Sequence, residues 1–197
     1  MMIVFDLSGV FFNNGLKEAI RRISEEYQLE PKIIEFVLNG SFAEKYRIGT
    51  IGLAKFWKNA KEYLKVEDIE GIKKIFFESY YPHPESVELL KNLRNKNFKL
   101  GYISNGPQDR SDFLDEKYGF ISLFDLGLFS FEAHVRKPDV KIYRKFIEKF
   151  NLNPEEIIYI DDAAKNLVSA KEVGMNIILF QTVKDLENKL NEFGIDI

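Results

Sequence analysis

Two rhythms of hydrophobic and polar positions divide the chain. Between residues 16 and 81 the apolar residues recur at helical spacing, without the strict alternation of a half-buried strand. This pattern predicts helices over 16–27, 31–39, 42–47, 53–64 and 66–80, separated by turns at Gly40 and at 49–52. We therefore expect an all-helical block in the first half of the chain.

From Pro84 onward, short apolar runs alternate with longer helical stretches. The runs predict strands over 99–104, 126–129, 157–160 and 176–179, and the stretches predict helices over 85–95, 109–118, 140–150, 165–173 and 184–193. Strands that alternate with helices of about 10–15 residues are typical of a parallel sheet covered on both faces. The predicted fold class is therefore α/β, with a doubly wound, Rossmann-like parallel sheet.

A further strand is predicted at the start of the chain, where the apolar run Ile3-Val4-Phe5 ends on Asp6 and is followed by Gly9. A short β-branched and aromatic run of this kind suits a central strand buried on both faces. The carboxyl ends of such strands open onto the ligand crevice of a doubly wound sheet, so Asp6 is expected there. We expect residues 1–14 and 83–197 to form the sheet domain and residues 15–82 to form a helical insert.

Length, charge and cysteine content exclude several classes of protein. The 197 residues suffice for one core with a modest insert, and a net charge of −3 with interleaved Lys, Glu and Asp offers no basic surface for nucleic acid. No apolar run reaches the ~18 residues of a membrane span, and the amino terminus lacks signal-peptide features, so we expect a cytoplasmic protein without membrane contact. The absence of cysteine excludes disulfides, thiolate metal sites and cysteine nucleophiles.

Four polar clusters lie at the end of a predicted strand or just before a predicted helix. They are Asp6 with Ser8, Ser104 with Asn105, Lys137, and Asp161 with Asp162. Taken singly, each has an ordinary explanation as a turn, a helix cap or a solvated lysine. Because the carboxyl ends of parallel strands meet in one crevice, we expect the four clusters to lie together.

The chemistry of these clusters is that of phosphoryl transfer. Three gathered carboxylates repel one another unless a cation lies among them, and hard oxygen ligands favour Mg²⁺. A phosphate beside that cation would contact the hydroxyl of Ser104, the amide of Asn105 and the ammonium of Lys137. The sequence therefore predicts a magnesium-dependent enzyme that acts on a phosphorylated substrate.

The same four clusters, in this order, resemble the signature motifs of the haloacid dehalogenase superfamily. Segments 130–139 and 166–174 also resemble its branch that includes small sugar-phosphate phosphatases and the amino-terminal domains of epoxide hydrolases. The resemblance implies that Asp6 is a nucleophile that forms an aspartyl-phosphate from a small phosphorylated metabolite, while Lys137 offsets the negative charge. It also implies that residues 15–82 are the family's movable cap.

The resemblance further implies a set of magnesium ligands. These are the carboxylates of Asp6 and Asp162 and the main-chain carbonyl of Ser8, whereas Asp161 acts through a coordinated water or by orienting Lys137. The family includes monomers and homodimers, and both states remain open for this chain.

Ser8 departs from the pattern of the family's phosphatases, which usually carry a second aspartate there as general acid and base. The loss of such a group typically lowers the rate by about 10²- to 10⁴-fold. Two alternatives therefore stay open: a 2-haloacid dehalogenase that uses Asp6 on carbon without a metal, and a catalytically weak relative that acts as a binding module. The adjacent acids Asp161 and Asp162 favour magnesium and phosphate chemistry over the dehalogenase alternative.

The insert itself offers less chemistry. Its aromatic residues Phe42, Tyr46, Phe56 and Trp57 are predicted to form its own core. Arg47 and the loop 49–52 are expected to line the entrance to the crevice. His134 is predicted to be a surface residue, and it has no metal-ligand spacing to His83.

Overall fold

Five parallel strands form the centre of the protein, in a computed structural model that describes residues 1–196. The strands are β1 (Met2–Phe5), β2 (Lys99–Ser104), β3 (Leu126–Phe129), β4 (Ile157–Asp161) and β5 (Asn176–Leu179). They lie in the order β3-β2-β1-β4-β5, with every neighbouring pair parallel, so the first strand is central. The predicted doubly wound sheet is confirmed.

Helices follow the strands and fill the insert. They are α1 (Gly15–Tyr27), α2 (Pro31–Asn39), α3 (Ser41–Arg47), α4 (Leu53–Leu64), α5 (Ile69–Glu78), α6 (Pro84–Asn95), α7 (Gln108–Tyr118), α8 (Ser130–Ala133), α9 (Val140–Phe150), α10 (Ala164–Glu172) and α11 (Val183–Glu192). The helix predicted over 66–80 is shorter in the structure, because the side chain of Asp68 accepts a hydrogen bond from the backbone N of Gly71 and caps α5. None of the helices within residues 1–196 is long and apolar enough to cross a membrane.

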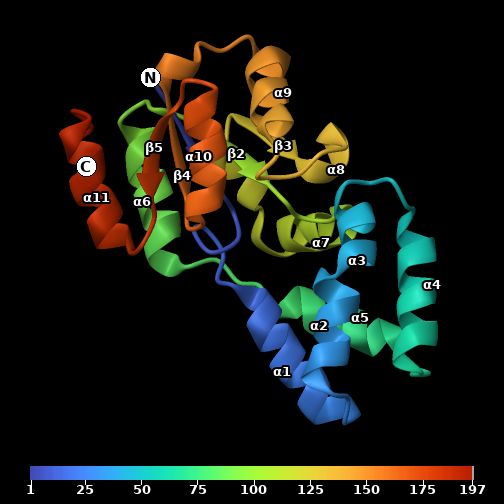
Figure 1. The fold of residues 1–197 in the computed structure, drawn as a ribbon. Coiled ribbons are helices and arrows are strands. Elements are labelled where there is room, and N and C mark those ends of the chain that lie inside the picture. The colour runs from blue at the N-terminus through green and yellow to red at the C-terminus, as the bar shows by residue number, and fades with distance from the viewer. Residues whose placement is uncertain (197) are drawn as a thin grey trace.

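Alternate residues of β1 point to opposite faces of the sheet. Ile3 and Phe5 share a core with residues of α6, α7 and α11, whereas Met2 and Val4 share one with residues of α9 and α10. Figure 1 shows α6 and α11 on one side of the strands and α9 and α10 on the other. All four residues of β1 are buried, which explains the unbroken apolar run in its sequence.

Helices α1 to α5 form a separate helical layer beside the sheet (Figure 1). Its centre is aromatic: the rings of Tyr46 and Phe56 stack with centroids 3.9 Å apart, and Trp57 meets Phe56 edge-on at 5.0 Å. Buried aromatic side chains of this size supply much of the packing of a small helical unit. We call this layer, residues 15–80, the cap.

Two linkers connect the cap to the sheet and are bonded to each other. Phe12 forms an antiparallel bridge with Pro82. The buried side chain of Asn13 donates from Nδ2 to the carbonyl oxygen of Ser79 at 2.9 Å and accepts from the backbone N of Tyr81 at 2.9 Å. The two linkers are therefore held together where the chain enters and leaves the cap.

Candidate active site

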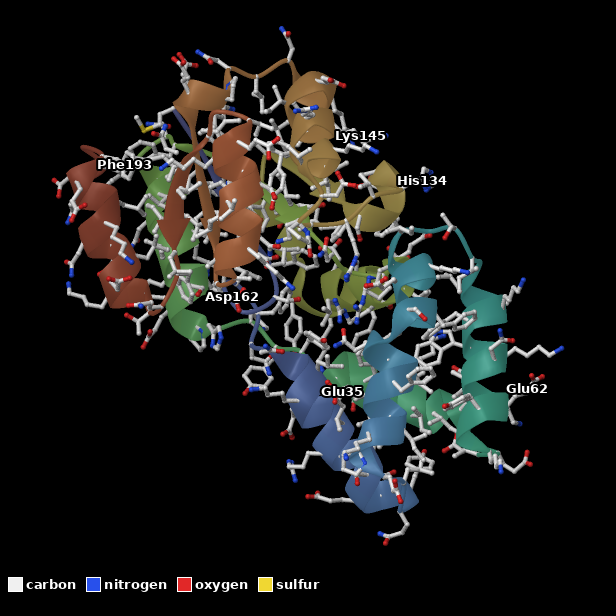
Figure 2. The ribbon with its side chains drawn as sticks, in the orientation of Figure 1. Glu35, Glu62, His134, Lys145, Asp162 and Phe193 are labelled. Atoms are coloured by element: carbon white, nitrogen blue, oxygen red, sulfur yellow. The ribbon has the colours of Figure 1, made fainter. Side chains whose placement is uncertain are left out.

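The predicted site residues lie at the carboxyl end of the sheet. Asp6 directly follows β1, Ser104 ends β2 and Asp161 ends β4. The backbone N of Asp6 donates to the carbonyl oxygen of Ile160 at 2.7 Å, so the pairing of β1 with β4 continues up to the site. Figure 2 shows Asp162 at the end of the sheet that faces the cap.

Lys137 lies between two carboxylates. Its Nζ is 2.8 Å from Oδ1 of Asp6 and 2.8 Å from Oδ2 of Asp161, and the side chain is 1% exposed. Burial alone would lower the pKa of the Lys137 ammonium, but the charges of the two carboxylates outweigh burial and raise it. Lys137 is therefore held as a cation.

Asn105 fixes the backbone of Lys137. Its Nδ2 donates to the carbonyl oxygen of Lys137 at 3.0 Å, and its Oδ1 accepts from the backbone N of Lys137 at 2.9 Å. The sequence predicts that this amide binds a phosphoryl oxygen. Asn105 therefore holds the backbone of Lys137, and because its amide nitrogen carries two N–H donors, the predicted contact with a phosphoryl oxygen stays open.

Asp161 is enclosed by donors. Besides Lys137, its carboxylate accepts hydrogen bonds from Oη of Tyr159 at 2.5 Å, from Nδ2 of Asn166 at 2.9 Å and from the backbone N of Ala163 at 2.8 Å. Burial raises the pKa of Asp161, but Lys137 and these hydrogen bonds outweigh it, so the net shift is downward. Asp161 is thus an anion in contact with Lys137, the arrangement that a role in orienting Lys137 needs.

Two of these partners, Tyr159 and Asn166, are absent from the predicted site. Tyr159 carries a sequence signal, because it precedes Asp161 by two residues in a strand and so points to the same face. Its hydroxyl also accepts a hydrogen bond from Nζ of Lys137 at 2.9 Å. Asn166 lies in the first turn of α10, where an amide is an ordinary helix residue with no pattern that marks it.

The acidic residues form a set that suits a divalent cation. Asp6, Asp161 and Asp162 each offer a carboxylate oxygen, and these oxygens lie within 4.8 Å of one another. Lys137 balances one of the three negative charges. Burial, together with Asp161 and Asp162, raises the pKa of Asp6 to about 7 despite the contact with Lys137. An excess of clustered carboxylate is the donor chemistry that Mg²⁺ requires.

Gly9 makes room for Asp162. Its φ is +90°, and a Cβ at this position would lie 2.3 Å from Oδ2 of Asp162. Only glycine adopts this conformation readily and leaves the space empty. The turn after Asp6 is therefore shaped so that the carboxylate of Asp162 rests against it, next to the half-buried Ser8.

Ser104 and the turn after Asp6 add further polar groups to the site. Ser104 is 2% exposed at the end of β2, and a Cβ on Gly106 would lie 3.7 Å from its Oγ. The backbone N of Leu7 donates to Oδ1 of Asp6 at 2.6 Å. The site thus combines a buried carboxylate, a buried ammonium and a hydroxyl, the groups that phosphoryl transfer uses.

A comparison with known families agrees with this arrangement. The family model of haloacid dehalogenase-like hydrolases matches residues 1–174. The chain belongs to this family. The resemblance carried by the four motifs is therefore confirmed.

This haloacid dehalogenase-like hydrolase has relatives of more than one activity. It is 28% identical over 189 residues to the phosphorylated carbohydrates phosphatase of Thermotoga maritima, covering 89% of this chain and 82% of that protein. It is 24% identical over 135 residues to (S)-2-haloacid dehalogenase 4A of Burkholderia cepacia, covering 64% and 58%. The family alone thus leaves the bond that is broken undecided.

The fold of the hydrolase is also found among solved structures. A haloacid dehalogenase family enzyme of Bacteroides thetaiotaomicron aligns with a TM-score of 0.79 at 22% identity, over 96% of this chain and 97% of that one. A complex of that enzyme with magnesium and inorganic phosphate aligns with a TM-score of 0.74 at 20% identity, over 91% and 93%. At this level of identity the likeness supports the fold.

The cap of this hydrolase is bonded to the sheet domain near the site. Asp109, in the first turn of α7, accepts hydrogen bonds from Oη of Tyr46 and, at 2.8 Å, from Nε1 of Trp57. Arg136 forms an ion pair with Glu44 of α3. Tyr46 and Trp57, predicted as packing residues of the cap, thus pack there and also hold the cap to α7.

Two further bonds join α8 to the cap. Ser130 Oγ donates to the carbonyl oxygen of Arg47 at 2.7 Å. The exposed His134, predicted as a surface residue, has its Nδ1 3.0 Å from the carbonyl oxygen of Ile48 (Figure 2). Together with the Asp109 contacts, these bonds hold the cap against the sheet domain.

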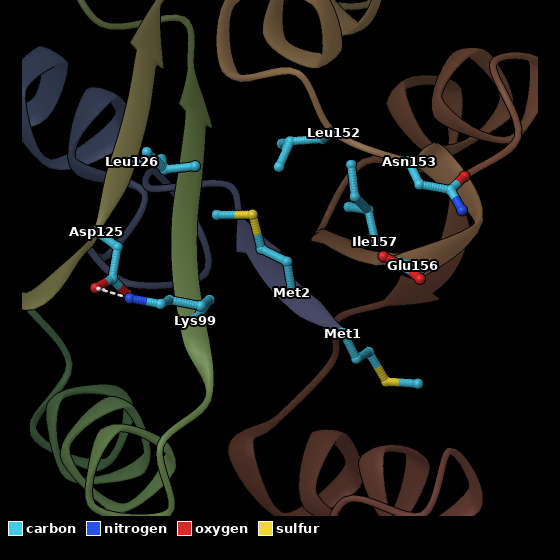
Figure 3. Close-up of a pocket in the computed structure, with 9 residues that line it drawn as sticks. All are labelled: Met1, Met2, Lys99, Asp125, Leu126, Leu152, Asn153, Glu156 and Ile157. Carbon is cyan, nitrogen blue, oxygen red and sulfur yellow. Dashed lines mark ion pairs between the residues drawn. The ribbon is translucent and has the colours of Figure 1, made fainter.

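A pocket of about 480 Å³ lies away from this site. It is lined by the first residues of four strands, Met2, Lys99, Leu126 and Ile157, with a Lys99–Asp125 ion pair at its rim (Figure 3). Ligands of doubly wound sheets bind at the opposite, carboxyl end of the strands. The carboxylate cluster, rather than this pocket, is therefore the candidate active site.

Proposed function

We propose that this hydrolase is a magnesium-dependent phosphatase of a small phosphorylated metabolite, with Asp6 as the nucleophile. The observation that carries the proposal is the buried contact of Asp6 with Lys137, in a cluster that retains an excess of carboxylate. The phosphatase of Thermotoga maritima and the magnesium and phosphate complex of the Bacteroides enzyme support the same chemistry.

In the proposed reaction Asp6 is first the nucleophile and then the leaving group. A carboxylate oxygen of Asp6 attacks phosphorus while the bond from phosphorus to the leaving oxygen breaks, which gives an aspartyl-phosphate. Water then attacks the phosphorus of this acyl phosphate, the bond from phosphorus to the Asp6 oxygen breaks, and inorganic phosphate and the free carboxylate are released. Lys137 holds Asp6 in place through Oδ1 and offsets charge on the phosphoryl oxygens, and the hydroxyl of Ser104 donates to one of them.

The remaining polar residues have supporting roles in this proposal. Asp6, Asp162 and the main-chain carbonyl of Ser8 would hold magnesium, which supplies positive charge to offset the carboxylates and the phosphate. Asp161 orients Lys137, since its own oxygens are already engaged by four donors. Asn105 fixes the backbone of Lys137 from the other side.

Ser8 determines which substrates are turned over fastest. A serine hydroxyl is too weak an acid to serve as a general acid near neutral pH, so the leaving alcohol has no positioned proton donor at this residue. An aryl phosphate has a leaving group that departs without protonation. We therefore expect aryl phosphates to be cleaved more readily than alkyl phosphates of similar size.

The test is hydrolysis of p-nitrophenyl phosphate and of a broad panel of phosphorylated metabolites, with magnesium and with a chelator. Activity is expected with magnesium and not with the chelator, and Asp6→Asn should abolish it. Asp185→Asn, which alters a half-buried carboxylate of helix α11, serves as the matched control and should retain activity. The absence of turnover across the panel would overturn the proposal.

The same preparation separates the alternatives. Halide release from 2-chloropropionate that persists in the chelator would assign the chain to the dehalogenases. No turnover of either class would leave the binding-module alternative, in which Asp6→Asn has no biological effect.

A further inference from the structure

Arg110 is a buried arginine without an acidic partner. It lies in the first turn of α7 and is 6% exposed. Its Nε is enclosed without a hydrogen-bond partner, and its guanidinium forms no ion pair or hydrogen bond with any residue among 1–196. A buried charge is ordinarily paired, so an unpaired guanidinium in this place requires an explanation.

Aromatic packing accounts for only part of this environment. The guanidinium carbon lies 4.0 Å from the ring centroid of Tyr80 and 5.4 Å from that of Phe76, both contributed by the cap. Cation–π contacts of this kind are attractive, but they offset only a fraction of the cost of removing a cation from water. Their geometry also leaves the edge of the guanidinium, where its N–H donors point, without an acceptor.

Arg110 faces the phosphate side of the active site. A Cβ placed on Gly106 would lie 3.5 Å from Nη2 of Arg110 and 3.7 Å from Oγ of Ser104. The same position would lie 2.8 Å from Oγ of Ser111, so the guanidinium of Arg110 and the hydroxyls of Ser104 and Ser111 are grouped around Gly106, whose missing side chain lets them approach one another. A group bound to Ser104 would have Arg110 as a neighbour on the cap side.

The acid next to Arg110 in the chain, Asp109, and the acid Glu44 across the cap boundary already have other partners. Asp109 binds Tyr46 and Trp57, and Glu44 pairs with Arg136. The nearby Arg47 is also without a carboxylate partner among residues 1–196, since its guanidinium donates to Asn39 Oδ1 and to the carbonyl oxygen of Leu38.

The positive charge of Arg110 acts on Arg47 of the cap. Burial lowers the pKa of Arg47 to about 10, and the positive charge of Arg110 is the next largest cause. Arg110 and Arg47 are therefore two neighbouring cations at this boundary, and neither has a carboxylate partner among residues 1–196. Such a region attracts and concentrates anions.

We propose that Arg110 is a second anion subsite, and that the substrate is a small phosphomonoester carrying a second anionic group. This inference rests on the proposed phosphatase function and names its substrate class. A guanidinium binds a carboxylate or a second phosphoryl group through the same paired N–H donors, so the shared chemistry is an oxyanion. The near-complete burial of Asp6, Ser104 and Arg110 restricts that substrate to a small molecule.

The test measures binding, so that it does not depend on turnover. Titration calorimetry in the presence of magnesium compares 3-phosphonopropionate with propylphosphonate, which has the same length but lacks the carboxylate. The ligand with the additional carboxylate, 3-phosphonopropionate, is expected to bind about 10- to 100-fold more tightly to the wild type, the effect of a hydrogen-bonded charge pair. Ethane-1,2-diphosphonate, measured alongside, shows whether the second group is a carboxylate, a phosphoryl group or either.

Variants assign the preference to Arg110. Arg110→Met should remove it, Arg110→Lys should keep part of it, and Arg136→Met, an arginine at the same boundary with an acidic partner, should keep all of it. Arg110→Met should also unfold at the same or a higher temperature than the wild type, because it removes a buried charge that lacks a partner.

Three results would overturn the inference: equal or undetectable binding of the matched phosphonates by the wild type, a preference that survives in Arg110→Met, or a large loss of thermal stability in that variant. The last would identify a purely structural arginine. Failure of Arg110→Met to fold counts as such a loss and likewise overturns the inference. Failure of the phosphatase proposal is seen separately, as absence of p-nitrophenyl phosphate hydrolysis.

Discussion

Replacing Lys137 by Met tests the charge balance of the site. Met retains most of the length of the lysine side chain but removes the ammonium that lies 2.8 Å from both Asp6 and Asp161. Removing one partner of a buried ion pair typically costs about 3–5 kcal/mol, because the remaining charge has no compensation. We therefore expect Lys137→Met to lower the free energy of unfolding by about that amount at pH 8, in the absence of metal.

The loss of unfolding free energy in Lys137→Met should be larger at high pH than at low pH. Without the ammonium, the folded protein favours protonated carboxyls at Asp6 and Asp161, whose pKa values rise above the value of about 4 that they have in the unfolded chain. A group whose folded pKa is raised binds its proton more tightly in the native state, so stability is lost as pH rises. Each proton contributes about 1.4 kcal/mol per pH unit in this range.

The wild type already shows part of this dependence, since burial raises the pKa of Asp6 to about 7. Between pH 8 and pH 6 the variant therefore regains more stability than the wild type, and we expect its deficit to shrink by about 1–2 kcal/mol. Urea unfolding followed by circular dichroism at the two pH values measures this difference. A deficit below about 1 kcal/mol at pH 8, or one that grows on acidification, would refute the reasoning.

Lys189→Met provides the matched control for that measurement. Lys189 Nζ is 2.6 Å from Oδ2 of Asp185, but both side chains are 32% exposed. Ion pairs in contact with water contribute about 0–1 kcal/mol, so this variant should lose little stability at either pH.

Three shorter predictions concern the metal site and its neighbours. Magnesium should raise the melting temperature more at pH 8 than at pH 6, because burial raises the pKa of both Asp6 and Asp162 and protons then compete with the metal; equal shifts at both values would contradict this. Gly9→Ala should lower the free energy of unfolding, measured by chemical denaturation, by about 1–3 kcal/mol, and it should also weaken the stabilisation by magnesium. Gly119→Ala is the control, because Gly119 also has a positive φ but no atom lies within 4 Å of its Cβ position. This variant should lose stability but keep the stabilisation by magnesium. Ser8→Asp should raise kcat for alkyl phosphates, by up to about 10²-fold, with little gain for aryl phosphates, and a uniform gain or none would show that Ser8 does not limit proton transfer.

The positions of the strands could be predicted because each is a short apolar run with a clear end. The run from Ile3 to Phe5 is apolar throughout since helices cover both faces of the sheet there, and the same reason makes 99–104 and 126–129 visible in the sequence. The alternation of strands with helices then fixed the fold class, because parallel neighbours need long crossovers. The single-turn α8 shows no periodicity and was beyond such reasoning.

The proximity of the four polar clusters could be predicted from one rule, that the carboxyl ends of parallel strands meet at one edge of the sheet. What the rule does not supply is the division of labour among residues once they meet. Asp161 and Asp162 are adjacent in the chain, yet one is enclosed by Tyr159, Asn166 and Lys137 while the other is exposed beside Gly9. This difference arises from contacts between distant elements, which a local pattern does not encode. The same holds for Arg110, whose sequence surroundings are those of a solvated helix.

Asp109 and Arg110 connect the cap to the phosphate side through one turn of helix. Asp109 binds Tyr46 and Trp57 of the cap, and the next residue, Arg110, stacks on Tyr80 and lies with Ser104 beside Gly106. Withdrawal of the cap would break the Asp109 contacts and also remove the rings that cover the guanidinium, returning Arg110 to water. A hydrated guanidinium binds an anion far more weakly than a desolvated one. The proposed subsite is therefore complete only when the cap is closed, so a substrate anion on Arg110 would stabilise the closed cap, and the two events are thermodynamically linked.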